Sequence, residues 1–475
     1  MGYFGRVKFP AFCLLGVLVA APALAQTAPF SVHTSATMLE HRSSFEMVQL
    51  GEDAVGGPAL MALGGYDGTV VTATTEMGIE NWDDVGPNVW EEAAPMLEAR
   101  MDFTAHVVLG DVWVFGGFDG TYTLDATERF DVTAGAWSQG PSMSVPRTNH
   151  RSVRMNDGRI LITGGFDGQV ETTMCEVFDP VDMTFTPVAP MNVGRASHTL
   201  TPVGDGRVVV TGGFNAAAGF QLASCEVYDP ANNTWTEIEP LPTAVDNHAA
   251  TLITLYTQAP NTIMVTGGRV YNAALNLFEG VASGALLDLG TMTWAPFDLM
   301  SPHSYHLSCH LDPNAPEVFI LGGADQTGVG VSTTYGATEW TFGNQASAWP
   351  EVSAQTQNRA RAAGSRSGTS NVACFTVCGG EEDLAGTCFT VCPETSSIAE
   401  PTAAAPEVGV HPNPAVGMAV VWSVDRVHEQ GWTLLSVGGK VVRQGRGNAL
   451  DVTGLPAGPY LLNLPDGRCA HVMVR

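Results

Sequence analysis

Seven short apolar segments of the chain end in a double glycine, and this recurrence constrains the fold more than any other feature of the sequence. Two examples are "VWVFGGFDG" and "ILITGGFDG". Such a segment predicts a buried strand that ends where a side chain would block a tight turn or a neighbouring backbone. The pairs are Gly64 and Gly65, Gly116 and Gly117, Gly164 and Gly165, Gly212 and Gly213, Gly267 and Gly268, Gly322 and Gly323, and Gly379 and Gly380.

The double glycines recur at intervals of 52, 48, 48, 55, 55 and 57 residues, and two further patterns keep step with them. In the first, an aromatic residue precedes an arginine by ten positions; in the second, a glutamate, an aromatic residue and an aspartate lie within four positions. A period near fifty, with 53 glycines and 29 prolines, indicates repeated units of short strands. The first pattern comprises Trp90 and Arg100, Trp137 and Arg147, Phe185 and Arg195, and Trp349 and Arg359, and the second comprises Glu128–Asp131, Glu176–Pro180 and Glu226–Pro230.

Together these motifs resemble the kelch repeat from about residue 29 to residue 396. The resemblance implies an all-β propeller of four-stranded blades around a channel, with the double glycine at the end of the second strand and the tryptophan on the fourth. We expect seven blades over residues 26–396; six blades with an irregular cysteine-rich tail are the alternative. No fourth-strand pattern follows Gly380, so we expect the segment after Phe30 to pair with the last blade and close the ring.

Residues 1–25 have the parts of a secretory signal peptide: the basic residues Arg6 and Lys8, an apolar segment, and Ala23 and Ala25 before the cleavage point. No later segment is long and apolar enough to cross a bilayer. We therefore predict a monomeric, secreted or cell-surface protein that is exported across the inner membrane. The formal net charge of −27 argues against nucleic acid and anionic lipid as partners.

A linker rich in Pro, Ala and Thr at 397–407 precedes a region of different texture at 408–475. Its sequence of short motifs resembles the C-terminal sorting domain of type IX secretion cargo. The resemblance implies a small β-sandwich that the export machinery recognises, and an ordinary β-sandwich is the alternative. The matching positions are Pro412, Asn413, Pro414, Gly439, Lys440, Leu455, Gly458 and Tyr460.

The segment "CFTVCGGEEDLAGTCFTVC" carries four cysteines around the last double glycine. If its halves pair as an antiparallel hairpin, two residues lie opposite each other when their numbers add up to a constant. The numbers of Cys374 and Cys392 add up to 766, and so do those of Cys378 and Cys388, so both pairs can lie opposite each other in one register. In an oxidising compartment we expect the disulfides Cys374–Cys392 and Cys378–Cys388, with free thiols as the main alternative. The spacing suits a zinc site poorly, and we predict no metal. No partner is predicted for Cys175, Cys225, Cys309 and Cys469.

The kelch resemblance places the loops after the double glycines and the loops that enter each blade on one face. Aromatic side chains there could stack on sugars, and arginines could bind carboxylates of a glycan or protein. The alternative for the arginines is a structural role between blades. The predicted mouth residues are Tyr66, Asp67, Arg100, Phe118, Asp119, Arg147, Phe166, Asp167, Arg195, Asn215, Arg269 and Asp325, with Arg42 and Arg359 beside them.

The sequence contains no zinc-protease motif, nucleophile elbow, phosphate loop or EF-hand loop. We therefore predict a binding or interaction module for a glycan or protein, without a cofactor. The alternative is a secreted sugar-modifying enzyme, such as a mutarotase or epimerase, which should gather acid–base residues in a deep pocket. Four histidines recur at one repeat position and are expected to be hydrogen-bonded scaffold residues rather than a metal ring: His150, His198, His248 and His306.

Overall fold

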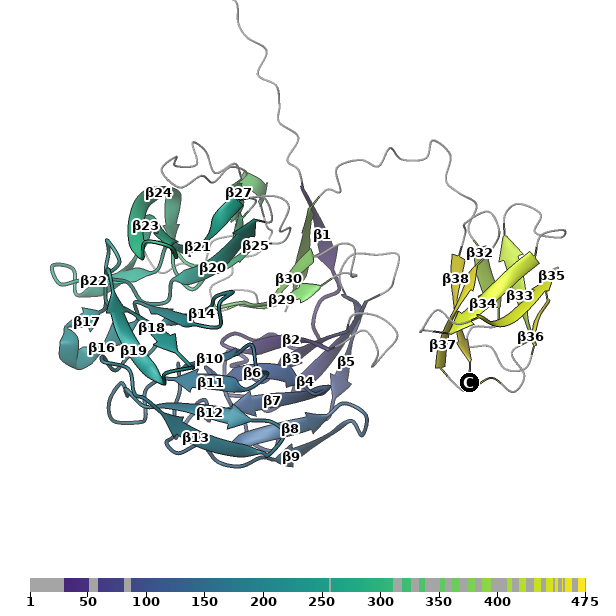
Figure 1. The fold of residues 1–475 in the computed structure, drawn as a ribbon, viewed down its shortest axis with the longest axis horizontal. Helices are drawn as coiled ribbons and strands as arrows, with labels where there is room; N and C mark the ends of the chain where they lie inside the picture. Colours follow the sequence, from purple (N-terminus) through teal and green to yellow (C-terminus); the bar gives the residue numbers. More distant parts are fainter. Residues whose placement is uncertain are drawn as a thin grey trace, which may run out of the picture.

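The computed structural model describes only part of the chain, and in several strands only the backbone. The described residues are 30–50, 59–80, 87–255, 258–310, 318–325, 333–337, 351–354, 361–367, 374–380, 387–393, 408–411, 418–423, 431–436, 441–446, 449–451, 455, 458–463 and 469–474. Figure 1 shows antiparallel sheets arranged around a common centre, with a separate group of strands from the C-terminal region.

Five blades have described side chains along most of all four strands, and their strands pair antiparallel in chain order. The double glycine follows the second strand in each blade, as expected. The first three blades contain β2 (Glu46–Leu50), β3 (Ala59–Leu63), β4 (Thr75–Glu80) and β5 (Pro87–Ala93); β6 (Thr104–Val108), β7 (Asp111–Phe115), β8 (Thr127–Asp131) and β9 (Ala136–Gln139); and β10 (Arg151–Arg154), β11 (Ile160–Thr163), β12 (Cys175–Asp179) and β13 (Thr184–Val188).

The fourth and fifth blades carry additional hairpins. The fourth blade contains β14 (Thr199–Pro202), β15 (Val208–Thr211), β18 (Cys225–Asp229) and β19 (Thr234–Ile238). An insertion between β15 and β18 contains β16 (Phe214–Asn215), the 3-10 helix η1 (Ala216–Ala218) and β17 (Phe220–Gln221). In the fifth, β20 (Ala249–Leu255) and β21 (Gln258–Thr266) are followed by β22 (Arg269–Asn272), the long strand β23 (Leu277–Asp288) and β24 (Thr293–His303). Strand β23 pairs with β22 through its first residues and with β21 and β24 through its later ones.

Two further sheets have four paired strands, but most of their side chains are not described. One contains β25 (Leu307–His310), β26 (Val318–Leu321), β27 (Thr333–Ala337) and β28 (Glu351–Ala354). The other contains β29 (Ala363–Ser367), β30 (Cys374–Cys378), β31 (Cys388–Pro393) and β1 (Phe30–Ser35). Strand β1 pairs antiparallel with β31, so the N-terminal strand supplies the fourth strand of the last sheet.

The predicted count of seven blades, with six as the alternative, is therefore corrected: the structure describes five blades with side chains along most of all four strands. The reason is that a double glycine marks only the end of a second strand. It does not establish that a full kelch-type blade surrounds that strand end, and the sheets around Gly322 and Gly379 are described mainly through backbone pairing.

Backbone hydrogen bonds join the inner strands to one another around the axis. One residue just before each inner strand donates its N–H to the carbonyl of its counterpart in the neighbouring sheet, at 2.9–3.4 Å. All of these residues have a left-handed backbone, with φ between 48° and 55°. We call this set the axial ring, and among the described residues it closes on itself: Ser44, Asp102, Asn149, Ser197, Asn247, Tyr305 and Arg361.

Buried arginines fasten the loops that enter the first four blades to the blade that follows each of them. Arg147 is 0% exposed; its Nη1 donates to the carbonyls of Gly164 and Met174 at 2.8 and 2.9 Å, and its Nη2 lies 2.8 Å from Oε1 of Glu176. The second carboxylate oxygen of Glu176 accepts from the backbone N–H of Ser144 in the same entering loop. Arg42 with Glu76, Arg100 with Glu128, and Arg195 with Glu226 repeat this arrangement.

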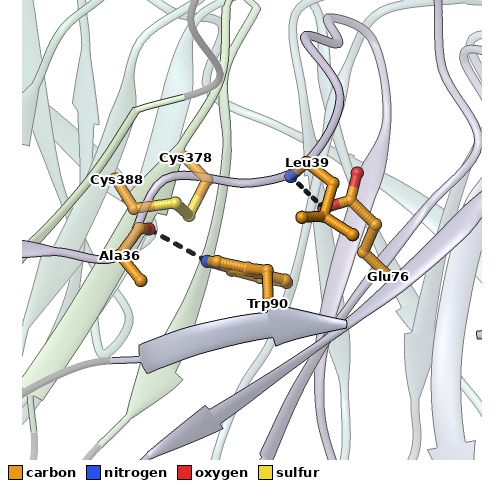
Figure 2. Close-up of a disulfide and its surroundings, with 6 residues drawn as sticks. All are labelled: Ala36, Leu39, Glu76, Trp90, Cys378 and Cys388. Carbon is orange, nitrogen blue, oxygen red and sulfur yellow. Dashed lines mark hydrogen bonds between the residues drawn. A yellow bond between two sulfur atoms is a disulfide. The ribbon is translucent and has the colours of Figure 1, made fainter. Parts of the chain in front are cut away.

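A disulfide within the last sheet and a hydrogen bond from the first blade lie side by side, as Figure 2 shows. Cys378 and Cys388 lie opposite each other in the register and form a disulfide, with a Cα–Cα distance of 4.2 Å. Beside it, Nε1 of Trp90 donates to the carbonyl of Ala36 at 3.0 Å. The side chains of the other predicted pair, Cys374 and Cys392, lie outside the described part of the structure. Cys175 and Cys225 are buried free thiols, and Cys309 is also buried.

The C-terminal region forms two antiparallel sheets, each described here by itself. One contains β32 (Val408–His411), β33 (Met418–Ser423) and β36 (Ala449–Asp451), and the other β35 (Val441–Arg446), β34 (Gly431–Ser436), β37 (Gly458–Asn463) and β38 (Cys469–Val474). Almost all side chains of these strands lie outside the described residues, so the predicted β-sandwich is not confirmed. Among the residues that are described, no helix has the length and apolar character needed to span a bilayer.

The buried pairs predict a large loss of stability when one partner is removed. Arg147→Met should lower the free energy of unfolding by about 3–5 kcal/mol, because Glu176 would stay buried without its counter-charge. Urea denaturation of the purified protein measures this value. The matched control is Arg159→Met, which removes an exposed ion pair with Asp157 and should cost about 1 kcal/mol or less. Equal losses for the two variants would contradict a structural role for Arg147.

Candidate functional site

The loops after the double glycines lie beside the loops that enter the blades. Isolated bridges join Tyr66 to Ser43, Phe118 to Met101, Phe166 to Thr148 and Arg269 to Asp246. In each of the five blades described above, both sets of loops occupy the same end of the strands. We call this surface the loop face, and it is where the predicted mouth residues Tyr66, Phe118, Phe166, Asn215 and Arg269 lie.

Three aspartates of the predicted mouth stabilise the loops in which they lie. Oδ1 of Asp67 accepts from the backbone N–H groups of Thr69 and Val70 at 2.6 and 2.7 Å. Asp119 and Asp167 make the same two contacts in their own loops. These bonds form Asx-type turns. The hydroxyl of Thr69, which also donates to Oδ1 of Asp67, is the largest cause that holds the pKa of Asp67 below its usual value, and the backbone N–H of Val70 adds to it. Each loop thereby becomes a rigid turn.

The tips of these rigid turns are apolar and exposed. Val70, Tyr122 and Val170 occupy equivalent positions and are 58%, 71% and 57% exposed. Neighbouring loops lie close together, because a Cβ added to Gly120 would come within 3.4 Å of a methyl group of Val71. A row of apolar tips therefore crosses three successive blades.

An aromatic cluster continues the loop face over the fourth and fifth blades. Phe220 on β17 packs against Tyr271 on β22, with ring centroids 4.6 Å apart, and Tyr271 packs against Phe278 on β23 at 5.3 Å. Arg269 stacks on Phe278 and is paired with buried Asp246 at 2.6 Å. The predicted residue Asn215 caps the short helix η1.

The arginines of the predicted mouth differ in accessibility. Arg100, Arg147 and Arg195 are 0% exposed and bonded to glutamates and glycine carbonyls, so their guanidinium groups are not available to a ligand on this face. Only Arg269 retains partial exposure, at 23% of its side chain. Asp325 directly follows Ala324, which bridges to Ser304 at the entrance of the next sheet.

A cavity of about 390 Å³ lies on the axis, lined by most of the axial ring and by the first residues of several inner strands. Its charged lining residues are Glu46, Asp102 and Arg151, which come from three successive blades, and Arg361, which precedes β29 of the last sheet; His106 and Ser152 lie beside them. Sequence reasoning missed this site. The repeat spacing could have located it, because every member of the axial ring lies two residues after the arginine of the repeat or its equivalent.

The surroundings of the cavity perturb its titratable groups. Burial raises the pKa of Glu46 to about 7; Arg151 opposes the rise and Asp102 adds to it. Burial also lowers the pKa of Arg151 from its usual value, and it lowers the pKa of His106 to about 4. At neutral pH, Glu46 is therefore partly protonated and His106 is uncharged.

The recurring histidines are held by hydroxyl groups. Nε2 of His150 lies 3.0 Å from Oγ1 of Thr104, whose hydroxyl accepts from Ser152, and Ser152 is 2.8 Å from Nε2 of His106. His198, His248 and His306 bond threonine hydroxyls in the same way. Phe45 and Phe103 occupy the same repeat position and contact double glycines likewise, which is consistent with a scaffold role.

The pKa of Glu46 predicts a pH-dependent effect of its removal. Because the native carboxyl group binds a proton more tightly than the unfolded one, its favourable contribution is complete below about pH 4.5 and is lost as pH rises through about 7. From pH 5 to pH 8, Glu46→Gln should therefore gain stability relative to the wild type, by about 2 kcal/mol. Urea denaturation of both proteins across this range measures the difference; a difference independent of pH would contradict the raised pKa.

Comparison with known proteins agrees with this architecture. The model of the kelch motif matches residues 99–144, 147–192 and 195–242. No curated protein matches the chain. One similar solved structure is described as a novel fungal alcohol oxidase of the AA5 family in complex with copper; it has 14% identity and a TM-score of 0.57, and the alignment covers 94% of this chain and 100% of the oxidase.

A second solved structure, described as that of YjhT, has 15% identity and a TM-score of 0.49, with 64% of this chain and 96% of that one covered. At these identities the likeness concerns the fold alone. The chain therefore contains three kelch motifs within a β-propeller of antiparallel blades, an architecture suited to binding partners.

Proposed function

We propose that this chain is a binding module that holds a protein partner on its loop face. The observation that carries the proposal is the row of exposed apolar tips, Val70, Tyr122 and Val170, on turns that their own aspartates hold rigid. Adjacent exposed apolar groups mark interaction surfaces, and rigid turns lose little conformational entropy when a partner binds. The partly exposed aromatic cluster around Phe220 and Tyr271 extends the same surface.

The chemistry of the tips favours a protein over a glycan. Two of the three tips are valines, whose methyl groups cannot bond sugar hydroxyls, while apolar protein side chains fit them well. The acidic surface of the chain would favour a partner with a basic rim by accelerating association. A glycan ligand is the other possible outcome of the experiment below.

We also propose that the chain is exported and then secreted or displayed through its C-terminal region. The signal-peptide pattern of residues 1–25 and the sorting motifs of residues 408–475 support this proposal, although both patterns come from the sequence. The disulfide between Cys378 and Cys388 adds support, because such bonds persist in oxidising compartments.

The loop-face proposal predicts a selective loss of binding. A photo-crosslinking amino acid at position 122 should capture the partner, and the triple variant Val70→Ser, Tyr122→Ser, Val170→Ser should bind that purified partner at least about tenfold more weakly, since several buried apolar contacts disappear. Biolayer interferometry measures the affinities, and a glycan array is screened in parallel.

The matched control changes equally exposed apolar residues at the opposite strand ends, through Leu109→Ser and Val181→Ser. These residues lie in the β6–β7 and β12–β13 turns, so the control should bind as the wild type does. Unchanged affinity of the triple variant, or binding to a glycan without a protein partner, would refute the loop-face proposal.

The export proposal predicts where truncated chains accumulate. In a bacterial host that has the type IX machinery, the full chain should reach the medium or the cell surface, whereas a chain lacking residues 408–475 should stay in the periplasm. Cell fractionation and immunoblotting measure both. If the truncated chain leaves the cell as efficiently as the full chain, the C-terminal region is not a sorting signal.

A further inference from the structure

The charged side chains at the axial cavity differ from the other buried charges of the blades. The arginines between loop and blade form ion pairs with glutamates at 2.8 Å or less. By contrast, Glu46, Asp102 and Arg151 form no ion pair within 4 Å in the part of the chain that the structure describes. Arg151 donates one Nη1 hydrogen bond to the carbonyl of His150, and the rest of its guanidinium group remains available.

Glu46, Asp102 and Arg151 are half-buried, so their charged groups remain accessible from the cavity. A ligand that pairs with such partly desolvated charges forms charge-assisted hydrogen bonds with them. Glu46, Asp102 and Arg151 interact electrostatically across the cavity without touching. The space between them is about 390 Å³, which lies within the usual range for a site that holds a small molecule.

The lining carries both signs: Glu46 and Asp102 are acidic, Arg151 is basic, and the second guanidinium, Arg361, is held on Tyr305. An anion could bind Arg151 but would be repelled by the two carboxyl groups, and a simple cation would be attracted by these carboxyl groups but repelled by the two guanidinium groups. A neutral sugar could form hydrogen bonds but would leave the charges of the lining without a counter-ion. A molecule with both a carboxylate and an ammonium group, a short distance apart, compensates both signs at once.

We propose that the axial cavity binds a small zwitterion of the α-amino-acid type, with its carboxylate on Arg151 and its ammonium group on Glu46 and Asp102. Leu307, which also lines the cavity, provides apolar surface for the side chain of such a ligand. This site is distinct from the loop-tip surface, and the inference does not depend on the proposed partner binding.

The perturbed titration of Glu46 agrees with this geometry. Its pKa is raised mainly because burial opposes its charged form, and a bound ammonium group would favour that charged form. The neighbouring His106 is neutral near pH 7, so it does not compete with Arg151 for the ligand carboxylate.

Isothermal titration calorimetry of the full propeller at pH 7.5 tests the proposal with unmodified protein. The standard L-amino acids are titrated first. The best binder is then compared with its N-acetyl derivative, which lacks the ammonium group, its carboxamide, which lacks the carboxylate, and D-galactose as a neutral sugar. We expect the amino acid to bind and each blocked derivative to bind at least about tenfold more weakly, since each loses one charge-assisted contact with the lining.

Substitutions of lining residues test whether the ligand binds in this cavity. Arg151→Gln and Glu46→Gln should each weaken binding at least about tenfold, while Arg159→Gln, which changes an exposed arginine on the same sheet, should leave it unchanged. Melting temperatures verify that every variant is folded, and Asp102→Asn replaces any variant that is not.

Three results would overturn the proposal. The first is that no amino acid binds more tightly than about 1 mM. The second is that a blocked derivative or the sugar binds as well as the amino acid. The third is that folded Arg151→Gln retains full affinity. Because the loop-tip variants leave the cavity unchanged, they should bind the amino acid normally, which separates this test from that of partner binding.

Discussion

The left-handed turn that precedes each inner strand is the constraint on which the rest of the structure depends. At this turn the backbone N–H of one sheet bonds the carbonyl of the next, so the axial ring fixes the distance between neighbouring inner strands. Residues such as Asp102 and Asn149 tolerate the positive φ because their short polar side chains can bond locally. The same turn directs side chains toward the axis and so creates the cavity.

The buried arginines make this arrangement specific. Each donates to carbonyls beside a double glycine and to a glutamate of the third strand, so one side chain binds the loop, the glycine turn and the blade together. Glycine is needed at Gly116, because a Cβ there would lie 2.6 Å from the carbonyl oxygen of Arg147. The arginine and the double glycine, which are the two most conspicuous sequence motifs of the repeat, therefore contact each other in the folded structure.

Two surfaces with different chemistry result from one repeat. On the loop face, aspartate-capped turns present apolar tips to the solvent, which suits a macromolecular partner. At the axis, the repeat position two residues after the arginine or its equivalent varies among serine, asparagine, aspartate, tyrosine and arginine, so the lining becomes asymmetric and charged. The repeat supplies a constant scaffold, and the variable positions determine which ligands can bind.

The sequence by itself determined the propeller class, the strand that each double glycine ends and the Cys378–Cys388 register, because local periodicity and spacing carry each of these. The β1–β31 pairing followed from a missing fourth-strand pattern at one end of the repeats and an unpaired one at the other. The sequence also located the loop face through Tyr66, Phe118 and Phe166. Only the tertiary structure decided which mouth residues reach solvent: Arg100, Arg147 and Arg195 are buried because their glutamates stand some thirty residues away in the chain. It also decided that Glu46, Asp102 and Arg151 share one cavity, since ring closure around an axis is a long-range property that no local pattern encodes.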